Sequence, residues 1–197
     1  MKIMKIQLKF ALVLMIAVSL AFTACTGDGD SGDVTVLEIG NEFQGGKMAY
    51  ILESGDPGYD ANVQHGLIAA TEDQSTIIMW AIAAFQSTAV PDTGTALGTG
   101  SANTDKIIAQ NGAGSTYAAG LARAYNGGSY TDWYLPSLNE LNQLYLNRVA
   151  VGGFADSAYW SSSEDSAANS WVQVFSDGSQ LNADKGDGIR VRAVRAF

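Results

Sequence analysis

The chain has 197 residues, a net charge of −9 and 47% hydrophobic residues, which suits about one average domain. Removing residues 1–24 takes away three lysines and no acid, so the remaining 173 residues hold 8 basic and 20 acidic side chains, a net charge of −12. This balance argues against a nucleic-acid-binding surface built on a large basic patch. All 22 glycines and all four tryptophans follow residue 24, which predicts a turn-rich globular domain rather than disorder or a coiled coil.

Residues 1–24 are predicted to be a lipoprotein signal peptide. Three lysines form a cationic start, residues 10–20 are apolar, and small residues lead to Cys25. The apolar run is too short for a comfortable membrane span. The Phe-Thr-Ala-Cys sequence resembles the bacterial lipobox, in which the cysteine carries the lipid. The alternative is ordinary secretory cleavage beside a cysteine with no special role.

Residues 25–33 are predicted to be a flexible acidic tether, because no apolar residue occurs among them. In lipoproteins an Asp after the cysteine favours retention at the inner membrane. Thr26 gives no such signal, so we expect an outer-membrane location. Cys25 is the only cysteine in the chain, which excludes an internal disulfide.

Residues 34–197 are expected to form one domain that begins with strands and continues with helices. Residues 86–104 are rich in Gly, Thr, Ser and Ala and read as a long surface loop. The expected strands cover 34–39, 48–52, 66–70 and 77–82, with a turn at Gly45-Gly46, and the expected helices cover 103–110 and 116–125.

A third helix is predicted to begin at Ser137. Ser137 and Glu140 have the spacing of a capping box, in which each side chain accepts a hydrogen bond from the other residue's backbone N–H. Leu138, Leu141 and Leu144 then recur at helical spacing and indicate one buried face. We therefore expect Glu140 to be structural rather than catalytic.

The remaining sequence predicts strands again. Because side chains alternate along a strand, Trp171 and Phe175 share one face, expected to be core, while Val172 and Val174 share the other and are expected to point outward. The expected strands cover 159–163, 170–175, 179–183 and 189–197, the middle two forming a hairpin around Asp177-Gly178.

Residues typical of enzymes are scarce in this body. His65 is the only histidine and no cysteine follows residue 25, which excludes the usual zinc sites and cysteine nucleophiles. The acidic stretches 28–33 and 177–187 do not follow an EF-hand loop. We expect Asp132 and Glu164 to be turn residues. Alternating arginines at 190, 192 and 195 are expected to pair with the surplus acids, an anion site being the alternative.

Five stretches resemble the Lcl C-terminal domain family, also seen as the major paralogous domain of Fibrobacter-type proteins. They are IGNEFQGGKMAYI at 39–51, HGLIAA at 65–70, DWYLPSLNELNQLY at 132–145, YWSSSE at 159–164 and RVRAVRAF at 190–197. The resemblance implies an α+β, C-type-lectin-like fold of the formylglycine-generating-enzyme type, with short antiparallel strands, two to three helices and long loops.

The resemblance also implies limits on activity. The helix-start motif of that fold corresponds to Leu135, Pro136, Ser137 and Glu140, and its terminal strand motif to Arg192 and Arg195. Its enzymatic branch depends on a cysteine pair that this body lacks, so we expect no enzymatic activity and no cofactor. The Glu-Pro-Asn and Trp-Asn-Asp triplets of calcium-dependent lectins are absent from the sequence, so no metal site is expected.

The C-terminal region further resembles the variable region of proteins diversified by retroelements, which mutate adenines, typically in AAC codons. Tyr159, Trp160, Trp171 and Phe175 would then be scaffold. The residues expected to face a ligand are all types that a mutated AAC codon can encode. They are Asp165, Ser166, Asn169, Val172, Val174, Ser176, Ser179, Leu181, Asn182, Gly186, Gly188 and Ile189.

These observations predict a lipid-anchored module of the outer cell surface that binds a surface protein or a glycan and acts in adhesion. Residues 34–197 would form its ligand-binding domain, with no nucleic-acid partner. The alternatives are a hydrolytic or polysaccharide-modifying envelope enzyme that uses Asp, Glu and His65, and a purely structural envelope lipoprotein.

Overall fold

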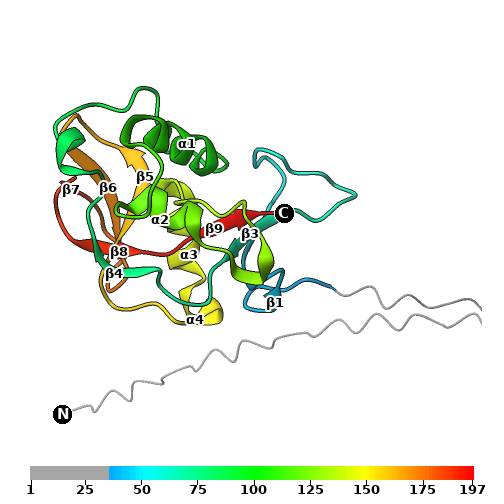
Figure 1. Ribbon diagram of the computed structural model, residues 1–197. Helices are drawn as coiled ribbons and strands as arrows, with labels where there is room; N and C mark the ends of the chain where they lie inside the picture. The colour runs from blue at the N-terminus through cyan, green and yellow to red at the C-terminus, as the bar shows by residue number, and fades with distance from the viewer. Residues whose placement is uncertain (1–35) are drawn as a thin grey trace, which may run out of the picture. The chain divides into compact units, whose positions relative to one another are not determined.

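The computed structural model describes residues 36–197 (Figure 1). These residues form an α+β fold with two sheets of short strands, four α-helices and long connections, which confirms the predicted class. The predicted signal peptide, the tether and Cys25 lie outside the described residues. Within residues 36–197, no helix combines the length and the apolar character needed to cross a membrane.

The first sheet has four antiparallel strands in the order β1-β2-β3-β9. The predicted strand at 34–39 is wrong for its described part, because residues 36–38 have no regular structure and pairing begins only at Glu42. The strands are β1 (Glu42–Phe43), β2 (Gly46–Ile51), β3 (Gly66–Ala69) and β9 (Val194–Ala196).

The second sheet has five strands in the order β4-β8-β5-β6-β7. Its β5–β8 pair is parallel, a departure from the expected antiparallel pattern, and the hairpin around Asp177-Gly178 joins β6 and β7 as predicted. The strands are β4 (Ser75–Ile78), β5 (Ala158–Glu164), β6 (Asn169–Val174), β7 (Gln180–Asp184) and β8 (Ile189–Val191).

The C-terminal segment does not form the single strand predicted at 189–197. It breaks at Arg192 and Ala193, so that β8 belongs to the five-stranded sheet and β9 to the four-stranded sheet. Figure 1 shows this segment in red, running from one sheet to the other. The break exists because Arg192 turns inward, where it is fully buried and pairs with Asp73 at 2.7 Å.

The predicted pairing of the arginines with acids is confirmed. Arg190 shares Asp73 with Arg192, at 3.0 Å, and Arg195 binds both carboxylate oxygens of Asp132 at 2.8 Å. Such bidentate contacts match the planar guanidinium, which explains why arginine rather than lysine stands at these positions.

Residues 36–197 contain four α-helices rather than the expected two to three, because a single turn, α4, directly follows α3. The capping box at the start of α3 is confirmed: the Glu140 N–H donates to Ser137 Oγ at 3.3 Å, and the Ser137 N–H donates to Glu140 Oε2 at 2.7 Å. The helices are α1 (Gly100–Asn111), α2 (Ala118–Ala124), α3 (Leu138–Leu146) and α4 (Arg148–Val151).

Apolar clusters cover both faces of the five-stranded sheet at β5 and β6. Trp160 and Val172 are register partners and belong to one cluster, whereas Tyr159 and Phe175 belong to the other, together with two leucines of α3, Leu141 and Leu144. Val172 is only 3% exposed. The prediction that Val172 points outward is therefore wrong, because alternation assigns the face of a strand but not what covers it.

Val172 and its register partner Leu181 on β7 provide a matched test of this packing. Leu181 is 53% exposed. We expect Val172→Asp to lower the free energy of unfolding by more than about 3 kcal/mol, since it buries an unpaired carboxylate. Leu181→Asp should change it by less than about 1 kcal/mol. Urea unfolding followed by circular dichroism measures both, and equal losses would contradict the assigned burial.

Candidate ligand-binding surface

The predicted ligand-facing residues differ in how far their side chains are exposed to solvent. Val172 belongs to the core and is unavailable to a partner. Exposed are Asp165, Ser166, Ser176, Leu181, Asn182 and Gly188, and partly buried are Asn169, Val174, Ser179, Gly186 and Ile189.

One group gathers where the β5–β6 turn meets β7. Asn182 Nδ2 donates to Asp165 Oδ2 at 3.1 Å, which joins the turn to the edge strand. Within the turn, the backbone N–H of Asn169 donates to Ser166 Oγ at 3.1 Å. These four residues, separated by up to 17 positions in the sequence, therefore form one surface.

A second group lies at the tip of the β6–β7 hairpin. Asp177 Oδ1 accepts hydrogen bonds from the backbone N–H of Ser179 at 2.9 Å and from its hydroxyl at 2.8 Å. These two hydrogen bonds hold the pKa of Asp177 below its usual value, and the bond from the backbone N–H has the larger effect. Gly178 provides the positive φ of 83° that the turn requires.

The last predicted residues lie apart from the hairpin. Ile189 pairs with Ile78 of β4, and the strand order places β5 and β6 between this edge and β7. Gly188 packs so closely on Ile77 that an added Cβ would lie 2.3 Å from its side chain. The structure thus separates Gly188 and Ile189 from the surface formed by the hairpin.

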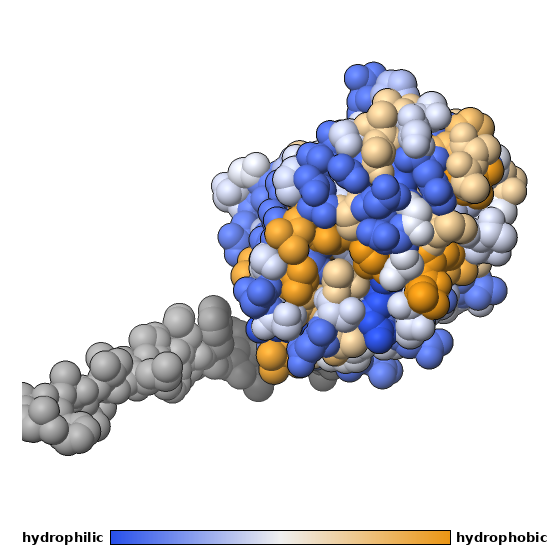
Figure 2. Space-filling model, turned by 90° about the vertical axis from the view of Figure 1, so that its left-hand side faces the viewer, coloured by the Kyte–Doolittle hydropathy of each residue, from blue (hydrophilic) through white to orange (hydrophobic). Residues whose placement is uncertain are grey.

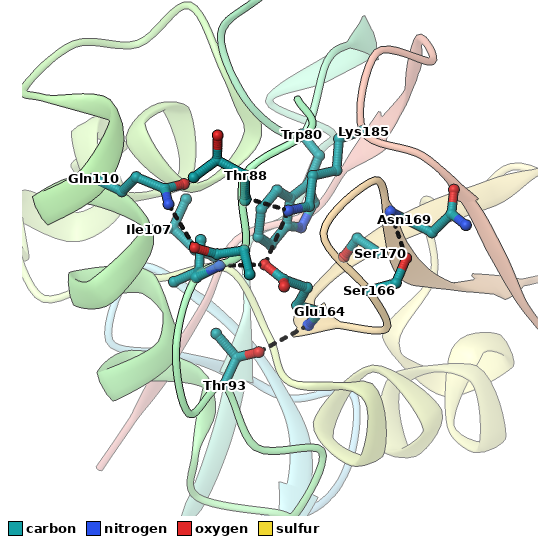
Figure 3. Close-up of polar contacts among 12 residues, drawn as sticks. Trp80, Thr88, Thr93, Ile107, Gln110, Glu164, Ser166, Asn169, Ser170 and Lys185 are labelled. Carbon is teal, nitrogen blue, oxygen red and sulfur yellow. Dashed lines mark hydrogen bonds and ion pairs between the residues drawn. The ribbon is translucent and has the colours of Figure 1, made fainter. Parts of the chain in front are cut away.

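A buried ion pair, which we name the Glu164–Lys185 clamp, supports this surface from beneath (Figure 3). Lys185 is fully buried, its Nζ lies 2.9 Å from Glu164 Oε2 and 2.9 Å from the carbonyl oxygen of Thr88, and it faces the Trp80 ring. Its backbone N–H donates to the carbonyl of Ala168 in the β5–β6 turn.

The clamp also fixes the loop that precedes α1. Glu164 Oε2 accepts the backbone N–H of Val90 at 2.7 Å, and the Glu164 backbone N–H donates to Thr93 Oγ1 at 3.0 Å. Glu164, which we expected to be a turn residue, is the last residue of β5. It also forms one half of an ion pair. Sequence reasoning missed this pairing because 21 residues separate Glu164 from Lys185.

The side of the molecule that carries β6, β7 and β8 has a mixed surface. Figure 2 turns this side to the viewer and shows apolar groups lying between hydrophilic ones. The exposed acids here are Asp165, Asp177, Asp184 and Asp187, whereas Lys185, the only basic residue between 165 and 189, is fully buried. The exposed charges between residues 165 and 189 are therefore all negative, and we expect a negative electrostatic field around them.

A separate cleft of about 380 Å³ brings together the residues that the alternative enzymatic hypothesis would use. His65, Asp132 and Glu140 all line it. Burial raises the pKa of Glu140, against the opposing effect of hydrogen bonds from the backbone N–H groups of Ser137 and Gly98. Asp132 is held by Arg195, whose hydrogen bond lowers its pKa. Both carboxylates thus already stabilise the fold. No group of three potential metal ligands occurs in residues 36–197.

The clamp predicts a strong energetic coupling between its two residues. Lys185→Met leaves Glu164 buried without its counterion, so we expect the free energy of unfolding to fall by about 3–5 kcal/mol. Combining it with Glu164→Gln should cost less than the sum of the single changes, by more than about 1 kcal/mol. A double-mutant cycle in urea measures this term. Strictly additive losses would mean that the pair does not stabilise the loop and the turn together.

Comparison with known proteins gives one family. Residues 69–195, more than half of the chain, match the model of the Lcl C-terminal domain. No curated protein matches the sequence. The matched range runs from the end of β3 to the middle of β9 and includes the clamp and the β6–β7 hairpin. The chain therefore belongs to the Lcl C-terminal domain family.

Proposed function

We propose that this protein is a non-enzymatic binding module of the bacterial cell surface, anchored to the outer membrane by lipid on Cys25. The β5–β6 turn and the edge strand β7 would present the ligand surface on a C-type-lectin-like scaffold. Membership of the Lcl C-terminal domain family supports a surface-binding role. The observation that carries the proposal is the Glu164–Lys185 clamp, which holds an exposed polar turn and an exposed strand together from beneath.

A rigid support of this kind suits binding because less conformational freedom is lost when a ligand is held. The exposed residues of the surface contribute little to the core, so their identity is free to serve recognition. The proposed ligand is a surface protein or a glycan. No nucleic acid is proposed, given the negative field of this side of the molecule.

A charge-changing variant tests the proposed surface. Asp165→Lys and Asn182→Lys together alter exposed positions only. The control combines Leu146→Asp and Val149→Asp, which are exposed on α3 and α4. Against arrays of cell-surface glycans and extracellular proteins, we expect the first variant to lose binding at least about tenfold and the control to bind like the wild type. Equal binding by both variants would remove the hairpin surface from the proposal.

Lipid anchoring has its own test. We expect the full chain, expressed in a Gram-negative host, to enter the detergent phase after phase separation and to fractionate with outer membranes. Cys25→Ser should move it to the aqueous phase, since the thiol that carries the acyl chains is lost. Retention of the variant in the detergent phase would show that Cys25 is not the attachment point.

Diversification by a retroelement is the third part of the proposal. We expect the genomic neighbourhood to contain a near-copy of the 3′ end of the gene, differing chiefly at adenines, beside a reverse transcriptase gene. Sequencing that neighbourhood provides the measurement. If both elements are absent, diversification is excluded, while the binding surface itself remains as proposed.

A further inference from the structure

Trp171 differs from the other three tryptophans of the chain. Trp80, Trp133 and Trp160 are fully buried, and each indole N–H donates to a backbone carbonyl, at 2.8, 3.2 and 2.8 Å respectively. Trp171 is only partly buried, and it belongs to neither apolar cluster of residues 36–197 nor to the side chains packed against them. The expectation that Trp171 is core scaffold is therefore not met.

The indole N–H of Trp171 also makes no hydrogen bond to residues 36–197. It has no hydrogen-bond acceptor within residues 36–197, and the only fully buried side-chain nitrogen or oxygen without a partner in that range is Gln110 Oε1. Trp171 Nε1 consequently reaches solvent. A partly exposed indole with an available N–H is typical of binding surfaces, because a tryptophan in a core usually finds an acceptor.

The neighbours of Trp171 on the same face of the sheet are polar. Trp171 on β6 lies opposite Asn182 on β7, and the pairs Asn169 with Asp184 and Gln173 with Gln180 stand on either side. Because alternate side chains share a face, these residues project to one side. We name this surface the Trp171 face; it consists of Trp171, Asn169, Gln180, Asn182 and Asp184, with Asp165 joined to it through Asn182.

Several polar groups of the Trp171 face remain available to a ligand. The side-chain amide of Asn169 makes no hydrogen bond within the described residues, and Asn182 uses only its Nδ2. Asp184 uses Oδ1 to accept the N–H of Gly186 at 2.8 Å. On the same face, Gln173 is fully buried and fixes Gln180 through a 2.9 Å hydrogen bond. The face thus combines an ordered base with free donors and acceptors.

We infer that the Trp171 face binds a neutral glycan, with one sugar ring stacked on the indole; this inference rests on the binding function proposed above. A sugar ring offers an apolar C–H face to an aromatic ring and a rim of hydroxyl groups to amides and carboxylates. Four residues of paired strand span about 14 Å, which accommodates a short oligosaccharide.

Protein ligands suit this face less well. The centres of protein interfaces are apolar and depleted in Asp, whereas every same-face neighbour of Trp171 on β6 and β7 is an amide or a carboxylate. The charges on the Trp171 face determine whether it suits neutral or acidic glycans. Asp165 and Asp184 are exposed, and Lys185, the only basic residue between 165 and 189, is buried in the clamp, so uronic acids and sulfated sugars meet repulsion and no counterion from this segment.

Single substitutions on the two sides of the hairpin test this inference with the full chain. The probes are an array of neutral glucan, mannan, galactan and N-acetylglucosamine oligomers, a matched array of uronic and sulfated oligomers, and a peptide display library. We expect binding to neutral oligomers, weakened at least about tenfold by Trp171→Ala and by Asn182→Ala. Leu181→Asp, on the opposite face of β7, serves as the control and should bind normally.

Intrinsic fluorescence gives a second readout. Since the other three tryptophans are buried, addition of a bound oligomer should change the emission of Trp171 alone, and this change should vanish in Trp171→Phe. Thermal unfolding by circular dichroism should show that Trp171→Ala remains folded, because the side chain lies outside both clusters.

The possible outcomes separate the two proposals. Equal binding of acidic and neutral oligomers, binding to peptides alone, or a loss caused only by Leu181→Asp would overturn the glycan inference and leave the proposed surface standing. Failure to bind any probe, or binding that no hairpin substitution affects, would overturn both.

Discussion

The structure depends on a buried ion pair at the place where the chain crosses twice between its sheets. The connection from β3 to β4 carries Asp73, and the connection from β8 to β9 carries Arg192. Arg192 is fully buried, and its guanidinium also donates to the carbonyls of Ala70 and Gly153. Because breaking such a pair leaves an uncompensated charge in the interior, the two crossings are held in one arrangement. The backbone continues this link, since the Ala70 N–H donates to Ala193 at 2.9 Å.

The proposed binding surface is built on a second ion pair of the same kind. Glu164 and Lys185 sit at the ends of β5 and β7, and through them the loop before α1 is fixed to the sheet. Both pairs place a long basic side chain inside the protein and satisfy it with one carboxylate and one or more backbone carbonyls. Such networks fix the positions of the groups that they join, which explains how an acidic domain without disulfides in its described part holds long loops in place.

Local chemistry predicted the elements whose signals are contained in a few residues. The capping box at Ser137 and Glu140 and the turn at Asp177-Gly178 depend on neighbouring atoms and occur as expected. The predictions were wrong where contacts between segments distant in the sequence determine the structure. The period of β6 assigned Val172 to a face correctly, but the cluster that covers that face comes from Trp80 and Ile107. Likewise, no pattern within 189–197 reveals that Arg192 turns inward to Asp73, more than 100 residues away in the sequence.

Exposed and buried positions of the β6–β7 hairpin and of the turn before it place different limits on sequence change. Ser166 and Leu181 are exposed, so replacing them costs little stability. Val172 contacts the core, where any polar side chain that a mutated codon introduced would be buried without a partner. A diversification mechanism acting on this hairpin would therefore yield folded proteins only if position 172 stayed apolar. Trp171 meets the opposite condition. Its indole lies outside both clusters, where packing does not require it, and the proposed glycan contact gives it a physical role.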